Sequence, residues 1–504
     1  MNLLGIDLGT SSVKVLITDE EGGVLSRGSA EYPMRTPQPG WVEQTPDEWW
    51  QATVLAVQQA LLGLKEEPGV GAIGLCGQMH GTVLLDSKDQ LLGPAIIWPD
   101  QRSSHQVEEI TALVGKERLI GITGSITATG FQAATLRWMQ QNKEQVWTKT
   151  RRVLLPKDYL RWRLCDRFGT DPSDAAGTGL LDGEGRTWSQ ELLDDLRIDA
   201  HLLPPIKPSI TPVGRLRSSA AHEFGLSKGI PVVVGAADTA ASLLGAGITE
   251  ARDLLLTIST GGQLITPSTT FIVDGAGRWH TFCSAAEPKE QAAGWYRMGA
   301  TLSAGQSLRW LRDNVFKTRS GDAYPQMMAW AEQTVIGAEG LFFTPYLSGE
   351  RVPARDLQIR GAFIGLTTRH GRAELVRAVL EGVVFSLYEK YLALVDNGVR
   401  PERLILAGGG ARSILWTQIA ADMFGLPVEK VVIEEQSAYG AALLAGAGVG
   451  IFDVAEGARE WRMLASQIEP NLKAHAQYQE LLTVYRELHQ RTRSFPSLVR
   501  SDKI

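Results

Sequence analysis

The sequence predicts an α/β protein made of two similar halves with a cleft between them. Near the N-terminus, three short apolar stretches have the pattern of consecutive strands, and the chain after them alternates between helix and strand patterns. Strands followed by such an alternation predict a mixed sheet with helices on its faces. A strand–loop–strand unit from the start of the chain recurs after residue 250, so we expect each half to carry one such sheet.

The first predicted domain, residues 1–245, opens with three strands and continues with a helix. The helix has a strong start, because Thr45 is a good N-cap, Pro46 suits the first helical position, and Glu48 stands where a capping box needs its acid. Apolar residues recur at helical spacing from Trp50 to Leu64. Strands of this domain are expected at 3–8, 13–18, 24–30, 72–76, 153–155 and 231–235.

The second predicted domain, residues 252–490, repeats this pattern after a boundary near 245–252. Its first strand, loop and returning strand resemble the start of the chain, as if one hairpin had been built twice. A later helix carries its apolar stripe from Trp416 to Met423 and ends at Gly425, a residue suited to a helix C-terminus. Strands are expected at 253–258, 263–266, 404–407 and 428–433, and a C-terminal tail at 491–504.

Composition excludes several classes of protein. Of the 504 residues, 44% are apolar and 21% charged, which excludes a disordered or fibrous chain. The net charge of −6 offers no electrostatic footprint for nucleic acid or for a membrane surface. No apolar run is long enough to span a bilayer, and the chain starts directly in a strand instead of a signal peptide. Three distant cysteines favour reduced thiols. We therefore expect a cytoplasmic enzyme without nucleic-acid or membrane partners; a homodimer stays open.

A polar loop after the first strand carries the first candidate site. Asp7 lies near the end of that strand, and small or hydroxylic residues follow it: Gly9, Thr10, Ser11 and Ser12. A buried carboxylate needs a charged or hydrogen-bonding partner, and a concave loop of N–H groups can approach phosphates closely. This pattern favours Asp7 as a ligand of hydrated Mg²⁺ between phosphates, with Lys14 adding positive charge. The alternative is an ordinary hairpin with a polar turn.

A second loop of the same chemistry occurs in the second half. It consists of Ser259, Thr260, Gly261 and Gly262, between two predicted strands. Two such loops, one in each domain, are what a cleft needs to grip a triphosphate tail from both sides. The pair therefore favours ATP as the ligand more strongly than either loop alone.

Three successive glycines form a third candidate for nucleotide contact. Gly408, Gly409 and Gly410 leave an apolar strand and enter a helix. Glycines at a helix N-terminus would let an adenine ring or the α-phosphate approach the backbone. The alternative is a tight turn between a strand and a helix.

Asp238 and His80 are the remaining candidates for chemistry. Asp238 follows a buried strand close to the predicted domain boundary. A carboxylate in a cleft suits a base that receives a hydroxyl proton during phosphoryl transfer, although an acid before a helix is more often an N-cap. His80 follows Met79 just after another buried strand and could hydrogen-bond a substrate hydroxyl; its alternative is a structural role.

These residues, with several short segments in chain order, resemble the FGGY family of carbohydrate kinases over residues 1 to about 485. Each segment is weak alone, but the combination is specific. Besides the first loop, the segments are GQMHG at 77–81, WPDQR at 98–102, LPKDYL at 155–160, SDAAGT at 173–178, PYLSGER at 345–351, RAVLEG at 377–382 and GGGARS at 408–413.

The resemblance implies two ribonuclease H-like domains, the fold shared with actin and hexokinase, closing on ATP–Mg²⁺ and a sugar. By position, Asp238 would accept the hydroxyl proton and Asp7 would organise Mg²⁺ and phosphate, with both carboxylates at the metal. The sugar side would include Met79, His80, Lys157 and Thr239. The nucleotide side would include Thr10, Ser11, Lys14, Ser259, Thr260, Gly261, Gly408, Gly409, Gly410 and Ser413.

The implied activity is transfer of the γ-phosphoryl group of ATP to a primary hydroxyl, with D-xylulose as the expected sugar. The chain departs from the pattern usual for that sugar, because Ala236 and Ala237 precede Asp238 where glycines are common, and Thr239 follows where asparagine is common. The second loop also begins with Ser259 where glycine is usual. The alternatives are a kinase for ribulose, ribitol, glycerol or gluconate, or a non-catalytic sugar or nucleotide sensor.

Overall fold

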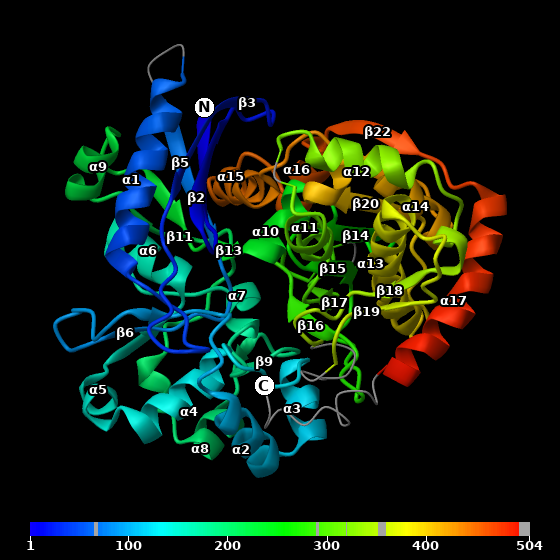
Figure 1. Ribbon diagram of the computed structural model, residues 1–504. Helices are drawn as coiled ribbons and strands as arrows, with labels where there is room; N and C mark the ends of the chain where they lie inside the picture. The colour runs from blue at the N-terminus through cyan, green and yellow to red at the C-terminus, as the bar shows by residue number, and fades with distance from the viewer. Residues whose placement is uncertain (65–68, 289–291, 319, 351–358, 493–504) are drawn as a thin grey trace.

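The computed structural model describes residues 1–64, 69–288, 292–318, 320–350 and 359–492. Within these ranges, two seven-stranded mixed sheets form, one in each half of the sequence. Figure 1 shows the first sheet and its helices on the left, in blue to green, and the second on the right, in green to red. This is the α/β architecture that the sequence predicts.

The first sheet joins an antiparallel meander to parallel strands. β1 pairs antiparallel with β2 and parallel with β5, and β5 pairs in parallel with β12 and β13. The strand order is β11 (Pro212–Arg215), β12 (Pro231–Val233), β5 (Val70–Gly77), β1 (Asn2–Leu8), β2 (Ser12–Thr18) and β3 (Val24–Glu31), with β13 (Ala236–Ala237) also on β5.

The second sheet repeats this plan. β14 takes the place of β1, since it pairs antiparallel with the next strand of the chain, β15, and parallel with β20. The strand order is β16 (His280–Cys283), β17 (Trp295–Thr301), β15 (Gly262–Ser268), β14 (Asp253–Ile258), β20 (Arg403–Ala407), β21 (Val428–Val431) and β22 (Leu464–Ile468). The two polar loops therefore occupy equivalent places, each between the first and second strands of its sheet.

Helices and three short ribbons complete the first half. The helices are α1 (Pro46–Leu62), α2 (Ser104–Val114), α3 (Lys116–Thr123), α4 (Gln132–Asn142), α5 (Glu144–Lys149), α6 (Pro156–Cys165), α7 (Pro172–Ala176), α8 (Gln190–Leu196), α9 (Ser218–Phe224) and α10 (Asp238–Gly245). The ribbons pair β4 (Glu43–Gln44) with β7 (Ala95–Ile96), β6 (Val83–Leu85) with β8 (Arg152–Leu154), and β9 (Leu181–Asp182) with β10 (Thr187–Trp188).

The second half is covered mainly by longer helices. They are α11 (Gly305–Trp310), α12 (Ala323–Ala331), α13 (Arg372–Val395), α14 (Ile414–Phe424), α15 (Gln436–Gly448), α16 (Val454–Glu460) and α17 (Leu472–Thr492). A ribbon pairs β18 (Phe342–Thr344) with β19 (Ala362–Ile364). No helix of the described residues is long and apolar enough to cross a membrane.

Helix α15 belongs to the second half in sequence but packs on the first sheet, beside α10 (Figure 1). Glycines allow this close approach: a Cβ on Gly5 would lie 2.0 Å from the Ala438 carbonyl oxygen, and one on Gly74 would lie 1.9 Å from that of Ala441. Between the two helices, a Cβ on Gly440 would lie 1.9 Å from the Ala241 carbonyl oxygen. The backbones are therefore in direct contact where the two halves join.

Two local predictions are corrected by the structure. Thr45 precedes α1 as expected, but its side chain caps no backbone N–H. Arg35 prevents the capping box, because its guanidinium donates to both Thr45 and Glu48. The strand predicted at 153–155 forms as β8, but in the small ribbon with β6 and not in the main sheet.

The predicted domain limits, 1–245 and 252–490, coincide with the end of α10 and the approach to β14. They stay a prediction, since α15 lies in the second range but contacts the first sheet. The predicted tail begins inside α17, and its residues 493–504 lie outside the described part of the chain.

Substitution of Gly74 tests the contact between α15 and the first sheet. We expect Gly74→Ala to lower the free energy of unfolding by about 1–3 kcal/mol, because the added methyl group collides with backbone. Gly121→Ala is the control, since that glycine lies within α3 with no atom near the Cβ position, and it should be neutral or stabilising by up to about 1 kcal/mol. Urea unfolding measures both; equal effects of the two substitutions would contradict the packing argument.

Candidate active site

Asp7 and Asp238 come together because three strands end in register. Asp7 of β1 lies opposite Cys76 of β5, and Ala236 of β13 lies opposite Cys76 on the other edge of β5. Asp238 follows two residues later as the first residue of α10. The Cys76 thiol donates to Asp7 Oδ1 at 3.5 Å. The two carboxylates therefore lie at the carboxyl ends of neighbouring parallel strands, an edge where α/β sheets bind ligands.

Both carboxyl groups hold their protons more strongly than usual. Burial, together with the charge of Asp238, raises the pKa of Asp7 to about 7. Burial raises the pKa of Asp238 to about 6, although hydrogen bonds from Thr239 act in the opposite direction. Perturbed pairs of acids are typical of functional sites, where a cation or a proton transfer offsets the cost of the charge.

The donor set at this edge fits a hydrated Mg²⁺. No group of three or more His, Cys, Asp or Glu side chains suited to a metal ion occurs among the described residues. Mg²⁺ does not require one, because it keeps several waters and takes one or two carboxylates together with substrate phosphates. Two neighbouring acids with raised pKa values therefore suit it.

Three side chains donate hydrogen bonds to the first polar loop. The Tyr32 hydroxyl donates to the Gly9 carbonyl oxygen, and Gln44 Nε2 donates to the Thr10 carbonyl oxygen at 2.7 Å. Trp98 Nε1 donates to Thr10 Oγ1 at 2.9 Å. The loop conformation is therefore held by groups that the sequence analysis did not connect with it.

Ser11, within this loop, and Lys14, just after it in β2, are exposed. The pKa of Glu434, which comes from the second half, is lowered mainly by its hydrogen bond with Arg412 and in part by the charge of Lys14. Lys14 thus lies on the side of the first domain that faces the second. Contact of Ser11 and Lys14 with ATP stays a prediction.

The second polar loop is tied to the start of α11. The Ser259 carbonyl oxygen accepts from the Gly305 N–H at 2.7 Å, and the Thr260 carbonyl oxygen accepts from the Ala304 N–H at 2.9 Å. Ser259 and Thr260 are exposed, and Gly261 is partly exposed. These residues are accessible to a ligand, and their nucleotide contacts stay a prediction.

The three glycines lie against the second loop. Gly408 has φ +80°, and a Cβ there would lie 2.6 Å from the Ile258 carbonyl oxygen. Gly408 and Gly409 are exposed, whereas Gly410 is buried against Ile258. Ser413 caps α14 by accepting from the Trp416 N–H at 3.1 Å. The glycines and the second loop therefore form one surface at the carboxyl ends of β14 and β20.

Met79 and His80 lie beside the end of α7. His80 has φ +73°, its Nδ1 hydrogen-bonds the Gly177 carbonyl oxygen, and its ring stacks on Phe131 at 4.2 Å between centroids. Phe282, from β16 of the second half, lies 6.3 Å from the His80 ring. Met79 is buried. Both residues stand where the halves meet, and their contact with a sugar stays a prediction.

Lys157 lies beneath the site and not at its surface. Its ammonium is completely buried and pairs with Asp158 at 2.8 Å, Asp171 at 3.2 Å and Asp174 at 3.6 Å. The side chain passes under Gly235, since Lys157 Cδ lies 3.3 Å from a Cβ built there. In this structure the ammonium of Lys157 is therefore paired with acids of the protein itself.

Thr239 acts on the carboxylate beside it. Its backbone N–H donates to Asp238 Oδ1 at 2.6 Å and its hydroxyl donates to the same oxygen at 3.2 Å. Ser437 of α15 donates to the Asp238 carbonyl oxygen at 3.2 Å. The other carboxylate oxygen, Oδ2, has no contact of this kind with Thr239, so Thr239 fixes the orientation of the candidate base.

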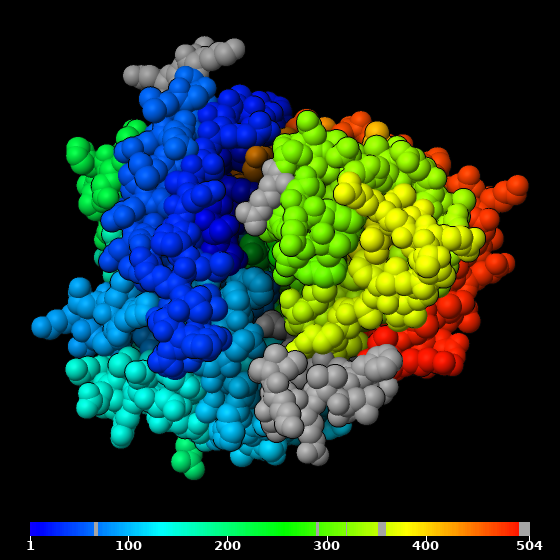
Figure 2. Space-filling model, viewed as in Figure 1, coloured from blue at the N-terminus to red at the C-terminus, as the bar shows by residue number. Residues whose placement is uncertain are grey.

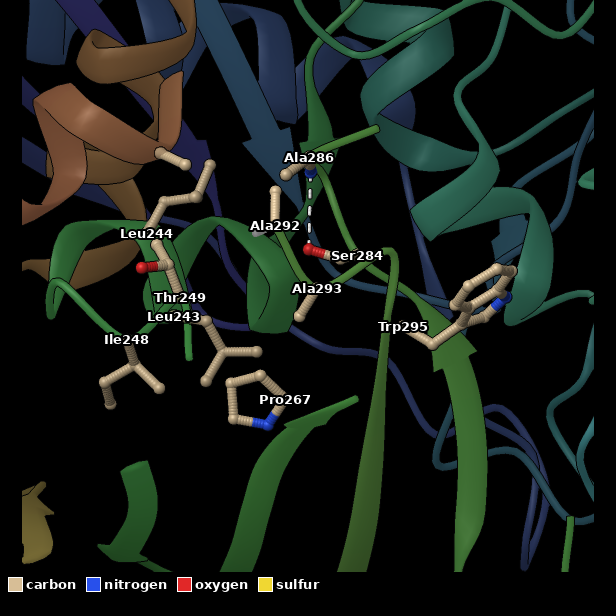
Figure 3. Close-up of a pocket in the computed structure, with 11 residues that line it drawn as sticks. Leu243, Leu244, Ile248, Thr249, Pro267, Ser284, Ala286, Ala292, Ala293 and Trp295 are labelled. Atoms are coloured by element: carbon tan, nitrogen blue, oxygen red, sulfur yellow. Dashed lines mark hydrogen bonds between the residues drawn. The ribbon is translucent and has the colours of Figure 1, made fainter. Parts of the chain in front are cut away.

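The surface between the halves is hollowed, and Figure 2 shows a furrow between the blue N-terminal part and the green part of the second half. A separate apolar pocket lies between α10 and the second sheet, with Leu243, Pro267 and Trp295 in its wall (Figure 3). Among the described residues, its lining carries no ionisable side chain, so we do not assign it to the candidate site.

Sequence reasoning did not assign roles to the acids and the arginine around Lys157. Asp158, Arg161, Asp171 and Asp174 are all completely buried, and burial raises the pKa of Asp174 well above its usual range. Charged residues in the apolar stretch around Lys157 could have indicated a buried ion cluster, but the sequence does not show which acids reach it.

The chain belongs to the FGGY family of carbohydrate kinases. The N-terminal domain model of that family matches residues 2–245, and its C-terminal domain model matches residues 254–449. The fold predicted from the resemblance is thereby confirmed, and the chain is a carbohydrate kinase.

Named relatives and solved structures cover nearly the whole chain. Xylulose kinase of Lactococcus lactis is 35% identical over 498 residues, 97% of each chain. Xylulose kinase of Escherichia coli is 38% identical over 422 residues, 84% of each chain. The crystal structure described as a "xyloylose kinase" from Brucella ovis has a TM-score of 0.91 and 33% identity, and covers 98% of this chain and 100% of that one.

The raised pKa of Asp7 predicts a pH-dependent cost to stability. In the unfolded chain the pKa is about 3.9, so the folded protein should lose stability as pH rises from about 4 to about 7. Without metal or nucleotide, we expect Asp7→Asn to be more stable than the unsubstituted protein by about 1–3 kcal/mol at about pH 8, with little difference at about pH 4.

Thermal unfolding in a chelating buffer at both pH values measures this effect. Glu460→Gln is the control, because Glu460 is an exposed acid at the end of α16 and its substitution should not change the pH dependence. The same stability difference for Asp7→Asn at both pH values would show that Asp7 is not the group responsible.

Proposed function

We propose that this carbohydrate kinase transfers the γ-phosphoryl group of ATP to a primary hydroxyl of D-xylulose. The observation that carries the proposal is the pair Asp7 and Asp238, two neighbouring acids with raised pKa values at the carboxyl ends of β1 and β13. The choice of sugar is supported by the relatives in L. lactis and E. coli, whose names say that they act on xylulose.

Asp238 is the proposed proton acceptor. A base works best when its pKa is near the working pH, and a pKa of about 6 leaves Asp238 ionised at neutral pH yet more basic than an ordinary carboxylate. Thr239 donates two hydrogen bonds to Oδ1. We propose that Oδ2 receives the sugar proton while the hydroxyl oxygen attacks the γ-phosphorus, which leaves ADP.

Asp7 is the proposed metal ligand, with Asp238 beside it. When bound, Mg²⁺ would neutralise phosphate charge, and the two carboxylates would then ionise more easily. Thr10, Ser11 and Lys14 on one side, and Ser259, Thr260 and Gly261 on the other, are the proposed phosphate contacts. Gly408, Gly409, Gly410 and Ser413 are the proposed nucleotide residues at the second sheet.

Met79, His80 and Thr239 are the proposed sugar-side residues. The stack of His80 on Phe131 holds the imidazole ring in place, which would keep a hydrogen bond to a sugar hydroxyl in fixed geometry. Thr239 bonds the base itself, so its methyl and hydroxyl groups would shape the pocket where an amide is more usual.

Gluconate is the second candidate substrate. Thr239 departs from the pattern usual for xylulose, and gluconokinase of Bacillus subtilis is 31% identical over 459 residues, 90% of this chain and 88% of that protein. We expect D-xylulose to give the highest kcat/KM in an ADP-release assay with D-xylulose, D-ribulose, ribitol, glycerol and D-gluconate. A higher value for another of these would replace the proposed sugar and keep the kinase activity.

Substitution of the proposed base tests the mechanism. We expect Asp238→Asn to lower kcat by roughly 10²-fold or more, since a positioned base typically contributes that much, with the KM for ATP little changed. Asp322→Asn is the control, because Asp322 is an exposed acid before α12, and it should keep full turnover. Near-normal turnover by Asp238→Asn would exclude Asp238 as the base.

A further inference from the structure

The segment that leads into Asp238 is attached to a buried network of charges. Arg161 Nη1 donates to the Val234 carbonyl oxygen at 3.2 Å, and the Gly235 N–H donates to the Ser209 carbonyl oxygen at 2.9 Å. The Ala237 N–H, one residue before Asp238, donates to Ser173 Oγ at 3.0 Å. The partners in these contacts, Arg161, Ser209 and Ser173, are all buried.

Asp171 orients the Ser173 hydroxyl, so that its oxygen accepts a hydrogen bond from the Ala237 N–H. Its hydroxyl hydrogen goes to Asp171 Oδ2, and that oxygen also accepts from the Ser173 N–H and from Ser209 Oγ, both at 2.9 Å. A hydroxyl has one hydrogen and two lone pairs; since the hydrogen of Ser173 goes to Asp171, a lone pair of Ser173 Oγ accepts from the Ala237 N–H. All these side chains are buried, with Ser173 and Asp171 at 0% exposure.

Asp171 in turn forms an ion pair with Lys157, with 3.2 Å between Asp171 Oδ1 and Lys157 Nζ. Lys157 also bonds Asp158, which accepts from Arg161 at 2.8 Å on the same oxygen. Asp174 is the third acid, 3.6 Å from Lys157, so two cations and three acids are packed together without access to water. Such a cluster has little freedom to move, because displacing one member leaves a buried charge without its partner.

We propose that Ser173 is a positioning residue for the base Asp238, and that the buried Lys157–Asp171 pair fixes Ser173 in the orientation this requires. The inference rests on the proposed function, in which Asp238 accepts the sugar proton. It gives Lys157 a part in the reaction without contact with the sugar. Because a small misplacement of a catalytic group is costly, one hydrogen bond to the residue before the base affects turnover more than binding.

Two serines on the same carboxylate oxygen allow a matched test. Ser173→Ala removes the hydrogen bond with the Ala237 N–H. Ser209→Ala removes only a hydrogen bond to Asp171 and keeps the bond between Ser173 and Ala237. We expect Ser173→Ala to lower kcat by about tenfold or more, with both KM values within about threefold, and Ser209→Ala to lower kcat by less than about threefold. Melting temperatures of both variants are measured alongside, so that loss of folded protein is not counted as loss of turnover.

The double variant with Asp238→Asn separates positioning from a general structural role. If Ser173 acts through the base, Ser173→Ala causes no further loss of kcat once Asp238 is asparagine. Three outcomes would overturn the proposal. The first is a double variant whose loss of kcat is the product of the two single losses. The others are equal losses of kcat in the two serine variants, or an unchanged kcat in Ser173→Ala. If Ser173→Ala does not fold, Ser173→Cys replaces it with the same expectations, because a thiol accepts hydrogen bonds weakly.

The same assay distinguishes failure of the base assignment from failure of the positioning role. Full turnover by Asp238→Asn alone would remove the proposed base, whatever Ser173 does. Loss of turnover in Asp238→Asn with full turnover in Ser173→Ala would keep the base and reject Ser173 as its positioning residue.

Discussion

The site depends on the register of three strands. β5 pairs with β1 on one edge and with β13 on the other, and both pairings place their partner opposite Cys76. Asp7 and Asp238 are thereby forced close together in a part-buried place, where two like charges are unfavourable. Burial is the main cause of the raised pKa of both carboxyl groups, and the charge of Asp238 raises the pKa of Asp7 further. Protonation of one acid, or a cation bound beside them, would lower that cost.

The proposed base, Asp238, also lies at the junction of the two halves. Asp238 begins α10, which packs against α15 with backbone in direct contact at Gly440. α15 rests on β1 and β5, the strands that carry Asp7 and Cys76. The contact between the halves therefore lies close to Asp7 and Asp238. The tight packing of small residues gives this junction little room for rearrangement, so the network under Asp238 is attached to a rigid support.

Local patterns were predicted well where one segment contains all the required information. The apolar runs gave the main strands, Gly425 ended its helix in the left-handed conformation as expected, and the two polar loops follow the first strand of each sheet. Predictions that needed a distant partner were less complete. The capping box at Thr45 was wrong because Arg35 binds both of its members. The resemblance implied a sugar-side role for Lys157 but gave no sign of the three acids that pair with its buried ammonium.

The sequence by itself determined the two-domain α/β fold, the family and the candidate residues, because apolar periodicity, turn glycines and short polar motifs are local properties of the chain. Only the tertiary structure decided that Asp7 and Asp238 share one sheet edge, that Ser173 accepts a hydrogen bond from Ala237, and that α15 crosses to the other half. Those facts depend on strand register and on close packing of residues far apart in the sequence, and hydrogen-bond partners at such separations leave no pattern within either segment.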